Sequence, residues 1–352
     1  MKPDYHKALI HSDRTIKDGI VMLNESAMRI LLVVDEKDRL LGTVTDGDIR
    51  RGILKEVALS EKIERIMFRE PRVLPLEEQD RAPAYMKEFQ VTSLPIVDDQ
   101  GVVRDLVIGH AYYNQRHFDP RENQVFVLAG GKGTRLSPFT NILPKPLIPV
   151  GETPIVELIM RKWKSFGFNR FILSLNYKAE MIKAYFGENP EGFDLQFVQE
   201  TEFLGTAGSL HLVRGKIQDT LFVINCDVLL DVDFDDFFRF HKESGDDATM
   251  IGVVHQVKIP YGVIEMQNGK LINMVEKPEH EIVVNAGIYA LEPSVLELVA
   301  DGEFLDMPGL LERSRKGGGK VGVYPVSTEM IDVGHWEEYE KANNSIKQGS
   351  LT

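Results

Sequence analysis

Residues 128–150, LAGGKGTRLSPFTNILPKPLIPV, combine glycines and basic side chains in a pattern suited to a polyphosphate ligand. The apolar run at 125–129 predicts a buried parallel strand, and three glycines follow it directly: Gly130, Gly131 and Gly133. Glycines in such a loop allow a tight turn and let backbone N–H groups approach phosphate oxygens closely. Three basic residues accompany them: Lys132, Arg135 and Lys145. The stretch therefore predicts a triphosphate-binding site.

This loop differs from two commoner phosphate-binding motifs. A Walker A loop requires Gly-x4-Gly-Lys followed by Ser or Thr, and no Gly-Lys pair of this chain is followed by either residue. A dinucleotide fingerprint requires Gly-x-Gly-x-x-Gly, but Leu136 stands where the third glycine belongs. The sequence thus argues against a P-loop kinase or ATPase and against a dinucleotide-dependent oxidoreductase.

Length and charge limit the remaining possibilities. The 352 residues are enough for two domains with separate cores. The formal net charge of -13 disfavours a general binder of nucleic acid or acidic membranes. A triphosphate site in such a chain requires a local basic pocket and a metal ion that shares the neutralisation.

Nothing in the sequence indicates export or membrane insertion. No apolar run approaches the roughly 20 residues that cross a bilayer, and the first residues lack the apolar core of a secretory signal. The single cysteine, Cys226, has no partner for an intrachain disulfide. We therefore expect a soluble cytoplasmic protein.

The first 120 residues contain an internal repeat with an offset of 63. The segment 32–35 (LVVD) recurs as 95–98 (PIVD), and helical patterns at 15–26 and 78–89 precede the two copies. Such a repeat predicts two copies of one small α/β unit packed together. The unit resembles a cystathionine-β-synthase (CBS) motif, which implies a tandem CBS pair over 1–118, with motifs at about 1–60 and 61–118.

The CBS resemblance implies at most one adenosine-type ligand. The segment 42–49, GTVTDGDI, matches the ribose-binding element of the family, where Thr45 would contact phosphate or hydroxyl groups and Asp48 would accept hydrogen bonds from ribose. The equivalents in the second copy, Ile108 and Ala111, cannot do this. Two alternatives stay open: the pair mainly dimerises or braces the chain, and Thr45 and Asp48 form a turn and a helix N-cap.

A polar, aromatic stretch without clear periodicity at 110–123 predicts a linker, which we place at 119–124, before a second domain at 125–352. In that domain, strand-like runs alternate with helical patterns. The strand-like runs lie at 125–129, 171–175, 195–198 and 221–224, and the helical patterns at 154–166, 180–186 and 336–346. The alternation predicts an α/β, Rossmann-like domain with a mostly parallel sheet and ligands at the carboxyl ends of its strands.

The stretch 130–146 resembles the signature of the sugar-1-phosphate nucleotidyltransferases, Gly-Gly-x-Gly-Thr-Arg-Leu followed by Pro-Lys-Pro. The resemblance implies a GT-A-like nucleotidyltransferase domain whose loop holds the nucleotide. A second stretch, LGTAG at 204–208, resembles the segment of the family that touches base and ribose, although an ordinary strand-to-helix turn is the alternative. The implied nucleotide-binding residues are Leu128, Ala129, Gly130, Gly131, Gly133, Thr134 and Gly205.

Two aspartates stand where the family places its metal ligands. Asp227 follows the strand-like run 221–224, and Asp332 lies in an Asp-x-Gly turn before the helical pattern at 336–346. Mg²⁺ favours one or two carboxylates together with phosphate oxygens. The resemblance therefore implies that Asp227 and Asp332 bind Mg²⁺, and the alternatives are a turn cap for Asp227 and a helix-approach role for Asp332.

Three further motifs, at 261–264, 276–278 and 285–289, resemble the sugar-phosphate pocket of the family and follow in its order. The implied sugar-phosphate-binding residues are Tyr261, Gly262, Glu276, Lys277 and Asn285. Glu276 and Asn285 would bond sugar hydroxyls, and Lys277 would hold the sugar phosphate.

The resemblance implies the reaction of an NTP with a sugar-1-phosphate to give an NDP-sugar and pyrophosphate. A phosphate monoester has a second pKa of about 6, so the attacking phosphate needs no general base. Positioning and electrostatics should supply most of the catalysis. The implied catalytic residues are Arg135, Lys145, Asp227 and Lys277.

The fusion of a CBS pair to a short transferase resembles the bacterial guanylyltransferases of legionaminic acid biosynthesis, which act on glucosamine-1-phosphate; this implies GTP as donor. The residues themselves leave base and sugar open. A uridylyl-, thymidylyl- or cytidylyltransferase and an inactive nucleotide-sensing regulator are the alternatives. We also expect an adenine nucleotide at the CBS pair, no nucleic-acid or membrane partner, and a homo-oligomer formed through either domain.

Overall fold

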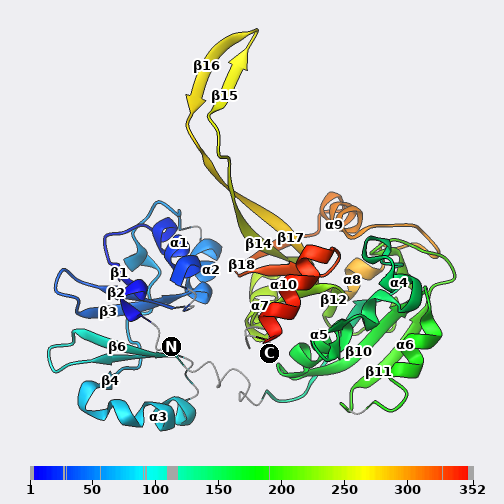
Figure 1. Ribbon diagram of the computed structural model, residues 1–352, viewed down its shortest axis with the longest axis horizontal. Helices are drawn as coiled ribbons and strands as arrows, with labels where there is room; N and C mark the ends of the chain where they lie inside the picture. The colour runs from blue at the N-terminus through cyan, green and yellow to red at the C-terminus, as the bar shows by residue number, and fades with distance from the viewer. Residues whose placement is uncertain are drawn as a thin grey trace. The chain divides into compact units, whose positions relative to one another are not determined.

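The computed structural model describes residues 4–26, 28, 30–55, 57–89, 91, 93–108, 118–189, 191–326 and 328–347. The chain divides into two compact units (Figure 1). Unit 1 comprises residues 1–122 with the short segments 161–169 and 233–240, and unit 2 comprises 123–160, 170–232 and 241–352. The two short segments that join unit 1 come from distant parts of the chain, which no local sequence pattern indicated.

Unit 1 contains the internal repeat as two small sheets of identical topology. The first consists of β1 (Leu9–His11), β2 (Ile30–Val34) and β3 (Leu40–Thr45), and the second of β4 (Leu74–Pro75), β5 (Ser93–Val97) and β6 (Val103–Ile108). In each, the first pair is parallel and the second antiparallel. The strands β5 and β6 begin and end 63 residues after β2 and β3, and the irregularities at Val33/Val34 and Ile96/Val97 keep the same offset.

The helices of the repeat are α1 (Ile16–Ser26), α2 (Asp46–Leu54) and α3 (Ala82–Glu88). Asp48 is buried at the start of α2, where one carboxylate oxygen accepts hydrogen bonds from the Thr45 N–H at 2.8 Å and the Thr45 hydroxyl at 2.7 Å. Its other oxygen accepts from Arg51 at 2.6 Å. These contacts agree with the alternative interpretation, in which Thr45 and Asp48 form a turn and cap the N-terminus of α2. Nucleotide binding by Thr45 and Asp48 stays a prediction. Ala111 lies outside the described residues.

A seven-stranded sheet forms the centre of unit 2. Its order is β11 (Asp194–Gln199), β10 (Phe168–Leu175), β7 (Arg121–Leu128), β12 (Leu221–Asn225), β17 (Glu279–Leu291), β14 (Ala248–Lys258) and β18 (Val321–Val326). Three neighbouring pairs, β10 with β11, β7 with β12 and β14 with β18, are parallel. The mostly parallel sheet is therefore confirmed, with β17 antiparallel to both of its neighbours.

The helices that follow β7 in the chain are α4 (Phe139–Ile142), α5 (Ile155–Lys164), α6 (Ala179–Tyr185), α7 (Phe234–Ser244), α8 (Pro293–Leu296), α9 (Met307–Lys316) and α10 (Trp336–Lys347). The core between sheet and helices joins Phe126 of β7, Val223 of β12, Tyr289 of β17 and Leu310 of α9, all buried. Consecutive residues of β7 and β12 are buried on both faces, as is typical of strands inside a parallel sheet. None of the helices in the described part of the chain has the length and apolarity needed to cross a bilayer.

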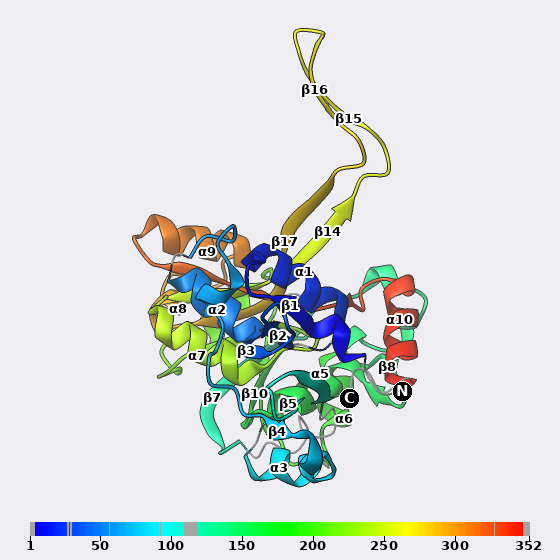
Figure 2. The ribbon, with the colours of Figure 1, turned by 90° about the vertical axis from the view of Figure 1, so that its left-hand side faces the viewer.

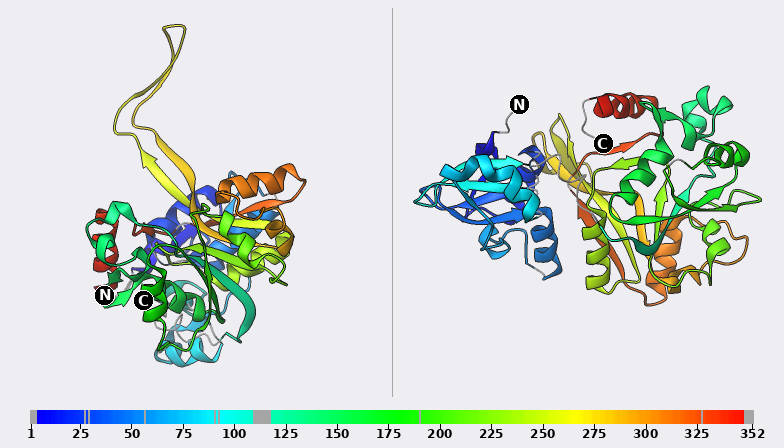
Figure 3. Two further views of the ribbon diagram at one scale, coloured as in Figure 1. Left: turned by 90° about the vertical axis from the view of Figure 1, so that its right-hand side faces the viewer. Right: turned by 90° about the horizontal axis from the view of Figure 1, so that it is seen from below.

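A two-stranded ribbon projects from the sheet of unit 2. Beyond the sheet, β14 and β17 continue into the hairpin of β15 (Val263–Gln267) and β16 (Lys270–Val275), drawn in yellow in Figures 1 and 2. The turn Asn268-Gly269 has positive φ at both residues, 50° and 76°, as a tight hairpin turn requires. We call residues 261–277 the arm; all of its residues are exposed. The left view of Figure 3 shows the same projection.

A buried histidine predicts how stability depends on pH. In α7, His241 is 1% exposed, with Nδ1 at 2.7 Å from the Thr249 hydroxyl and Nε2 at 3.0 Å from a Glu292 carboxylate oxygen. Burial lowers the pKa of His241 below its ordinary value of 6.5, although Glu292 and Asp246 oppose the shift and Lys242 adds to it. The unfolded chain then binds a proton more readily than the folded chain, so stability should fall as pH drops below about 6.5.

We expect the midpoint of thermal unfolding to fall less between about pH 7.5 and about pH 5.5 in His241→Gln than in the native protein. The measurement is thermal unfolding followed by circular dichroism at both pH values. Equal decreases in the two proteins would show that His241 does not govern this part of the pH dependence.

Candidate nucleotide and metal site

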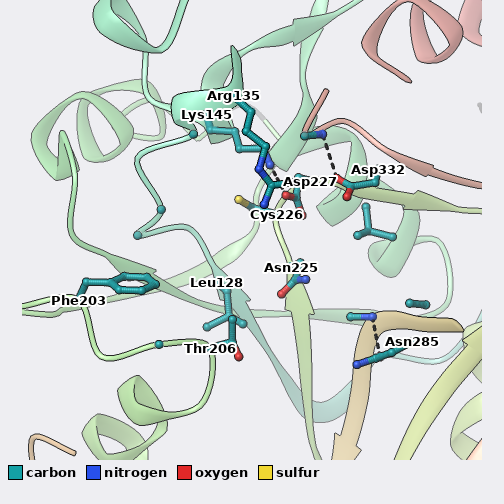
Figure 4. A pocket seen from close by; sticks show the side chains of 18 of the residues that line it. Leu128, Arg135, Lys145, Phe203, Thr206, Asn225, Cys226, Asp227, Asn285 and Asp332 are labelled. Carbon is teal, nitrogen blue, oxygen red and sulfur yellow. Dashed lines mark hydrogen bonds and ion pairs between the residues drawn. The ribbon is translucent and has the colours of Figure 1, made fainter. Parts of the chain in front are cut away.

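A cavity of about 470 Å³ opens at the carboxyl ends of β7 and β12 (Figure 4). The parallel register places Asn225 of β12 beside Leu128 of β7, so the segments that follow both strands emerge at the same edge. Of the residues predicted from the sequence, the cavity is lined by Leu128, Gly130, Gly131, Gly133, Thr134, Arg135, Lys145, Gly205, Asp227, Asn285 and Asp332. The edge of the sheet expected to carry the site is therefore where the cavity lies.

The other predicted residues of this domain do not line the cavity. Ala129 is buried beneath the loop, and its N–H donates to the Ser174 carbonyl at 3.0 Å. The remaining four all lie on the arm: Tyr261, Gly262, Glu276 and Lys277. Their roles in binding sugar phosphate stay predictions.

The glycine loop is held against the lysine that follows it. Gly133 has φ of 64° and caps the short 3-10 helix Thr134–Leu136. A Cβ on Gly133 would lie 2.9 Å from both the Lys145 Cβ and the Thr140 Cγ2. Position 133 therefore requires glycine for two reasons: the backbone is left-handed there, and a side chain would clash with Lys145 and Thr140. The absence of a side chain lets the Pro-Lys-Pro segment pack against the loop.

A pair of short strands brings the two predicted metal ligands together. Strand β13 (Val228–Leu230) pairs antiparallel with β19 (Met330–Asp332), and Val228 lies opposite Asp332. The Val333 N–H donates to the Asp227 carbonyl at 2.8 Å, which extends the pairing by one step. Asp227 and Asp332 thus become neighbours although 104 residues separate them in the sequence.

Lys145 already occupies part of this carboxylate site. Its ammonium group forms an ion pair with the Asp227 carboxylate. The same Nζ lies 3.3 Å from where a Cβ of Gly334 would stand, and the Gly334 N–H donates to Asp332 at 2.9 Å. The Lys145 ammonium group therefore lies between the Asp227 carboxylate and the turn that follows Asp332.

The two carboxylates suit Mg²⁺, which prefers a few carboxylates together with phosphate oxygens and water. Within the described residues, no group of three or more His, Cys, Asp and Glu side chains could hold a metal without such help. The residues present thus fit a metal that arrives with a nucleotide better than one held by protein alone.

Cys226 lies beside Asp227 but is not a candidate nucleophile. Burial, the main cause, and the negative charges of Asp227 and Asp332 raise the pKa of the Cys226 thiol to about 12, with Lys145 opposing. The thiol is neutral at physiological pH, and the thiolate is the reactive form. Cys226 is accordingly a buried residue in the wall of the cavity and not a reactive group.

The prediction of a local basic pocket is wrong for the side chains that line this cavity. Two basic side chains, Arg135 and Lys145, face three acidic ones, Glu200, Asp227 and Asp332. The lining therefore contains one more acidic than basic side chain. A triphosphate needs additional cations to bind here.

Sequence reasoning missed several lining residues, of which Glu200 is the most informative. It follows β11, is 6% exposed, and accepts hydrogen bonds from the Ser174 hydroxyl at 2.7 Å and the Leu204 N–H at 3.2 Å. An acidic residue at the carboxyl end of a strand was the available signal. Phe203 and Asn225 also line the cavity, as do Thr206 and Tyr289, which belong to the motifs 204–208 and 285–289 singled out from the sequence.

The LGTAG loop is fixed by the segment that begins α9. The Ala207 N–H donates to the Leu305 carbonyl at 2.8 Å, and the Met307 N–H donates to the Thr206 hydroxyl at 2.8 Å. Gly205 has φ of 80°, and a Cβ there would lie 2.6 Å from the Leu305 carbonyl oxygen. These contacts keep the loop at the cavity wall.

Comparison with known proteins agrees with this geometry. A family model described as nucleotidyl transferase matches residues 124–349. The chain belongs to the nucleotidyl transferase family. A CBS domain model matches residues 3–55, which include the first copy of the repeat.

Several relatives of this nucleotidyl transferase have assigned activities. The probable mannose-1-phosphate guanylyltransferase 1 of Oryza sativa subsp. japonica is 37% identical over 186 residues, 50% of this chain and 52% of the relative. The UTP--glucose-1-phosphate uridylyltransferase of Synechocystis is 30% identical over 245 residues, 63% of each chain. The chain thus spans less than two thirds of the length of these relatives.

Among solved structures, HddC from Yersinia pseudotuberculosis, complexed with GMP-PN, is 28% identical and superimposes with a TM-score of 0.51. The similarity covers 64% of this chain and 99% of HddC. The fold of the second domain is thus shared with a nucleotide-bound structure.

Two glycines of the loop make a matched pair for testing its geometry. We expect Gly133→Ala to destabilise the protein by about 1–2 kcal/mol, because L-residues are disfavoured in the left-handed region and the new Cβ would be crowded. Gly131 is the control, since a Cβ there meets nothing within 4 Å and its φ is not positive. Thermal unfolding of both variants would measure the difference, and equal midpoints would contradict this account of the loop.

Proposed function

We propose that this protein transfers a nucleotidyl group from an NTP to a sugar-1-phosphate and releases pyrophosphate. The observation that carries the proposal is the convergence of Asp227, Asp332 and Lys145 beside the glycine loop in one cavity. Family membership supports the class of reaction.

The reaction requires little acid–base chemistry from the protein. A sugar phosphate with a second pKa of about 6 is largely dianionic at neutral pH and attacks the α-phosphorus without a base. The obstacle is repulsion between two anions, so cations and orientation should provide the acceleration. The neutral thiol of Cys226 takes no part.

Each group of the cavity has a role in this scheme. The loop N–H groups of Gly130, Gly131 and Gly133 bind phosphate oxygens, and Arg135 compensates charge on the departing pyrophosphate. Mg²⁺ held by Asp227 and Asp332 would neutralise negative charge on the α-phosphate. Lys145, ion-paired with Asp227 in this structure, has phosphate oxygens as alternative partners once a nucleotide is bound.

We propose GTP as the donor. Guanine presents N1–H and N2–H donors on one edge, and the Glu200 carboxylate at the cavity wall is an acceptor-only group suited to them. Each carboxylate oxygen retains a lone pair beyond its bond to Ser174 or Leu204. A guanylyltransferase relative and the GMP-PN complex of HddC support the choice, whereas the Synechocystis relative makes UTP the main alternative.

The acceptor we propose is a hexose-1-phosphate, in the first instance glucosamine-1-phosphate. Mannose-1-phosphate and glucose-1-phosphate, named for the two relatives, are the competing acceptors. An adenine nucleotide bound at the CBS segment and a cytoplasmic location complete the proposal.

Release of pyrophosphate with Mg²⁺ tests the reaction. GTP, UTP, dTTP, CTP and ATP are crossed with glucosamine-, mannose- and glucose-1-phosphate, and we expect GTP to be preferred. Asp227→Asn should lower kcat by at least about 100-fold, as expected when a main electrostatic group of a transition state is lost. Asp301→Asn, at an exposed ion pair with Arg214, is the control. Lack of turnover with every pair, or full activity of Asp227→Asn, would refute the proposal.

Glu200 should decide the preference among bases. We expect Glu200→Gln to lower kcat/KM for GTP by about 10- to 100-fold, since hydrogen bonds to charged groups contribute about 1.5–3 kcal/mol. The rate with UTP should change less. Glu202→Gln, at an exposed residue outside the lining, is the control. Equal losses for GTP and UTP in Glu200→Gln would assign Glu200 a structural role only.

A further inference from the structure

The two basic side chains of the cavity are held in different ways. The Lys145 ammonium group forms an ion pair with the Asp227 carboxylate. Arg135 instead has its Nη1 at 2.9 Å from the Nε2 of His335, and within the described residues it forms no ion pair with a carboxylate. Both side chains line the same cavity (Figure 4). A neighbouring carboxylate therefore offsets the positive charge of Lys145, whereas the charge of Arg135 is not offset in this way.

The chemistry of the Arg135–His335 contact fixes the state of the imidazole. A guanidinium group has only hydrogen-bond donors, so Arg135 donates and His335 Nε2 accepts. An imidazole that accepts at Nε2 carries its proton on Nδ1 and is neutral. His335 therefore orients the guanidinium group without adding a negative charge beside it.

The backbone of His335 is fixed on both sides. Two residues before it, the Val333 N–H donates to the Asp227 carbonyl at 2.8 Å, which extends the β13–β19 ladder. His335 also immediately precedes α10, and its carbonyl accepts the first hydrogen bond of that helix, from the Tyr339 N–H at 2.9 Å. The imidazole is thus presented from a short rigid turn that also contains Asp332, one of the two predicted metal ligands.

The residue type at position 335 is not explained by the helix that follows. The residue before the first turn of a helix is most often Ser, Thr, Asp or Asn, whose side chains accept hydrogen bonds from backbone N–H groups of that turn. Histidine is not among them. The side chain of His335 bonds instead to Arg135, 200 residues earlier in the chain. The contact with Arg135 accounts for a histidine at this position, and helix capping does not.

A second contact attaches the segment that carries Arg135 to the same turn. Phe139 of α4 lies against Trp336, the first residue of α10, with ring centroids 5.0 Å apart. Leu136, next to Arg135 in the chain, is buried. Since these contacts hold the segment independently of His335, a change of the His335 side chain should alter the guanidinium group and leave the loop in place.

We propose that His335 is a positioning residue for Arg135, which it holds through a neutral acceptor so that the full positive charge of the guanidinium group stays available to the phosphates of the nucleotide. A carboxylate at position 335 would orient Arg135 as well, but it would offset the charge on which phosphate binding depends. The inference rests on the proposed function for the ligand that Arg135 receives.

Three substitutions separate the orientation of Arg135 from its charge. His335→Gln keeps a neutral acceptor, His335→Glu has nearly the same shape but adds a negative charge, and His335→Phe keeps a ring without an acceptor. We expect kcat/KM to stay within about 3-fold of the native value in His335→Gln and to fall by about 10-fold or more in the other two variants. His11→Phe, at an exposed histidine of unit 1, is the control. Equal losses in His335→Gln and His335→Glu, or an unimpaired His335→Phe, would overturn the proposal.

Binding of pyrophosphate with Mg²⁺, measured by titration calorimetry, gives a readout that does not require turnover. We expect His335→Glu and His335→Phe to weaken pyrophosphate binding by about 10-fold, and His335→Gln to change it little. If the native enzyme turns over no substrate pair but the pyrophosphate affinities follow this order, the proposed function fails and the positioning role stands. Equal affinities in His335→Gln and His335→Glu, or no binding of pyrophosphate by the native protein, would overturn the positioning role.

A double-mutant cycle asks whether His335 acts through Arg135. Pyrophosphate affinity is compared in the native protein, Arg135→Ala, His335→Phe and the double variant. Because His335 has no other role in this proposal, the double variant should bind pyrophosphate no more weakly than Arg135→Ala alone. Losses that add in the double variant would show that His335 acts independently of Arg135 and would overturn the proposal.

Discussion

The pairing of β13 with β19 is the constraint on which the site depends. Each strand has only three residues, but the pair joins the segment after β12 to the turn before α10. It sets Asp227 beside Asp332, and two adjacent carboxylates repel each other unless a cation lies between them. Lys145 forms an ion pair with Asp227, which ties the loop after β7 to this aspartate, and its Nζ also lies close to Gly334, whose N–H donates to Asp332. One short ladder thereby gathers three distant segments into a cation site.

The sheet fixes the positions of these segments, because the loops of the site emerge from one rigid edge of it. The register that places Asn225 beside Leu128 delivers the glycine loop and the Asn-Cys-Asp segment to the same level. Gly133 then lets Lys145 approach the loop, and Gly205 lets the LGTAG loop approach Leu305. The glycines thus act at the contacts between loops, where a side chain would separate them, as well as at the cavity surface.

Local sequence patterns were enough to predict the buried strands and the internal repeat. The buried runs of β7, β10 and β12 and the 63-residue repeat are visible in the sequence because period and burial leave a direct mark on residue type. Other features depend on contacts between residues that are distant in the sequence, and they leave no direct mark on residue type. Examples are the antiparallel course of β17, the β13–β19 pair and the Lys145–Asp227 ion pair. The arm is the clearest case: residues 264–267 alternate between apolar and polar side chains as in a half-buried strand, yet all of Val263–Gln267 is exposed.

The excess of carboxylates in the cavity bears on selectivity under the proposed function. A pocket lined mainly by lysine and arginine would bind any phosphate, including free phosphate and pyrophosphate. Here Asp227, Asp332 and Glu200 outnumber Arg135 and Lys145, so an anion that arrives without a cation meets net repulsion. A nucleotide that carries Mg²⁺ brings the compensating charge with it and turns the two aspartates from a penalty into ligands.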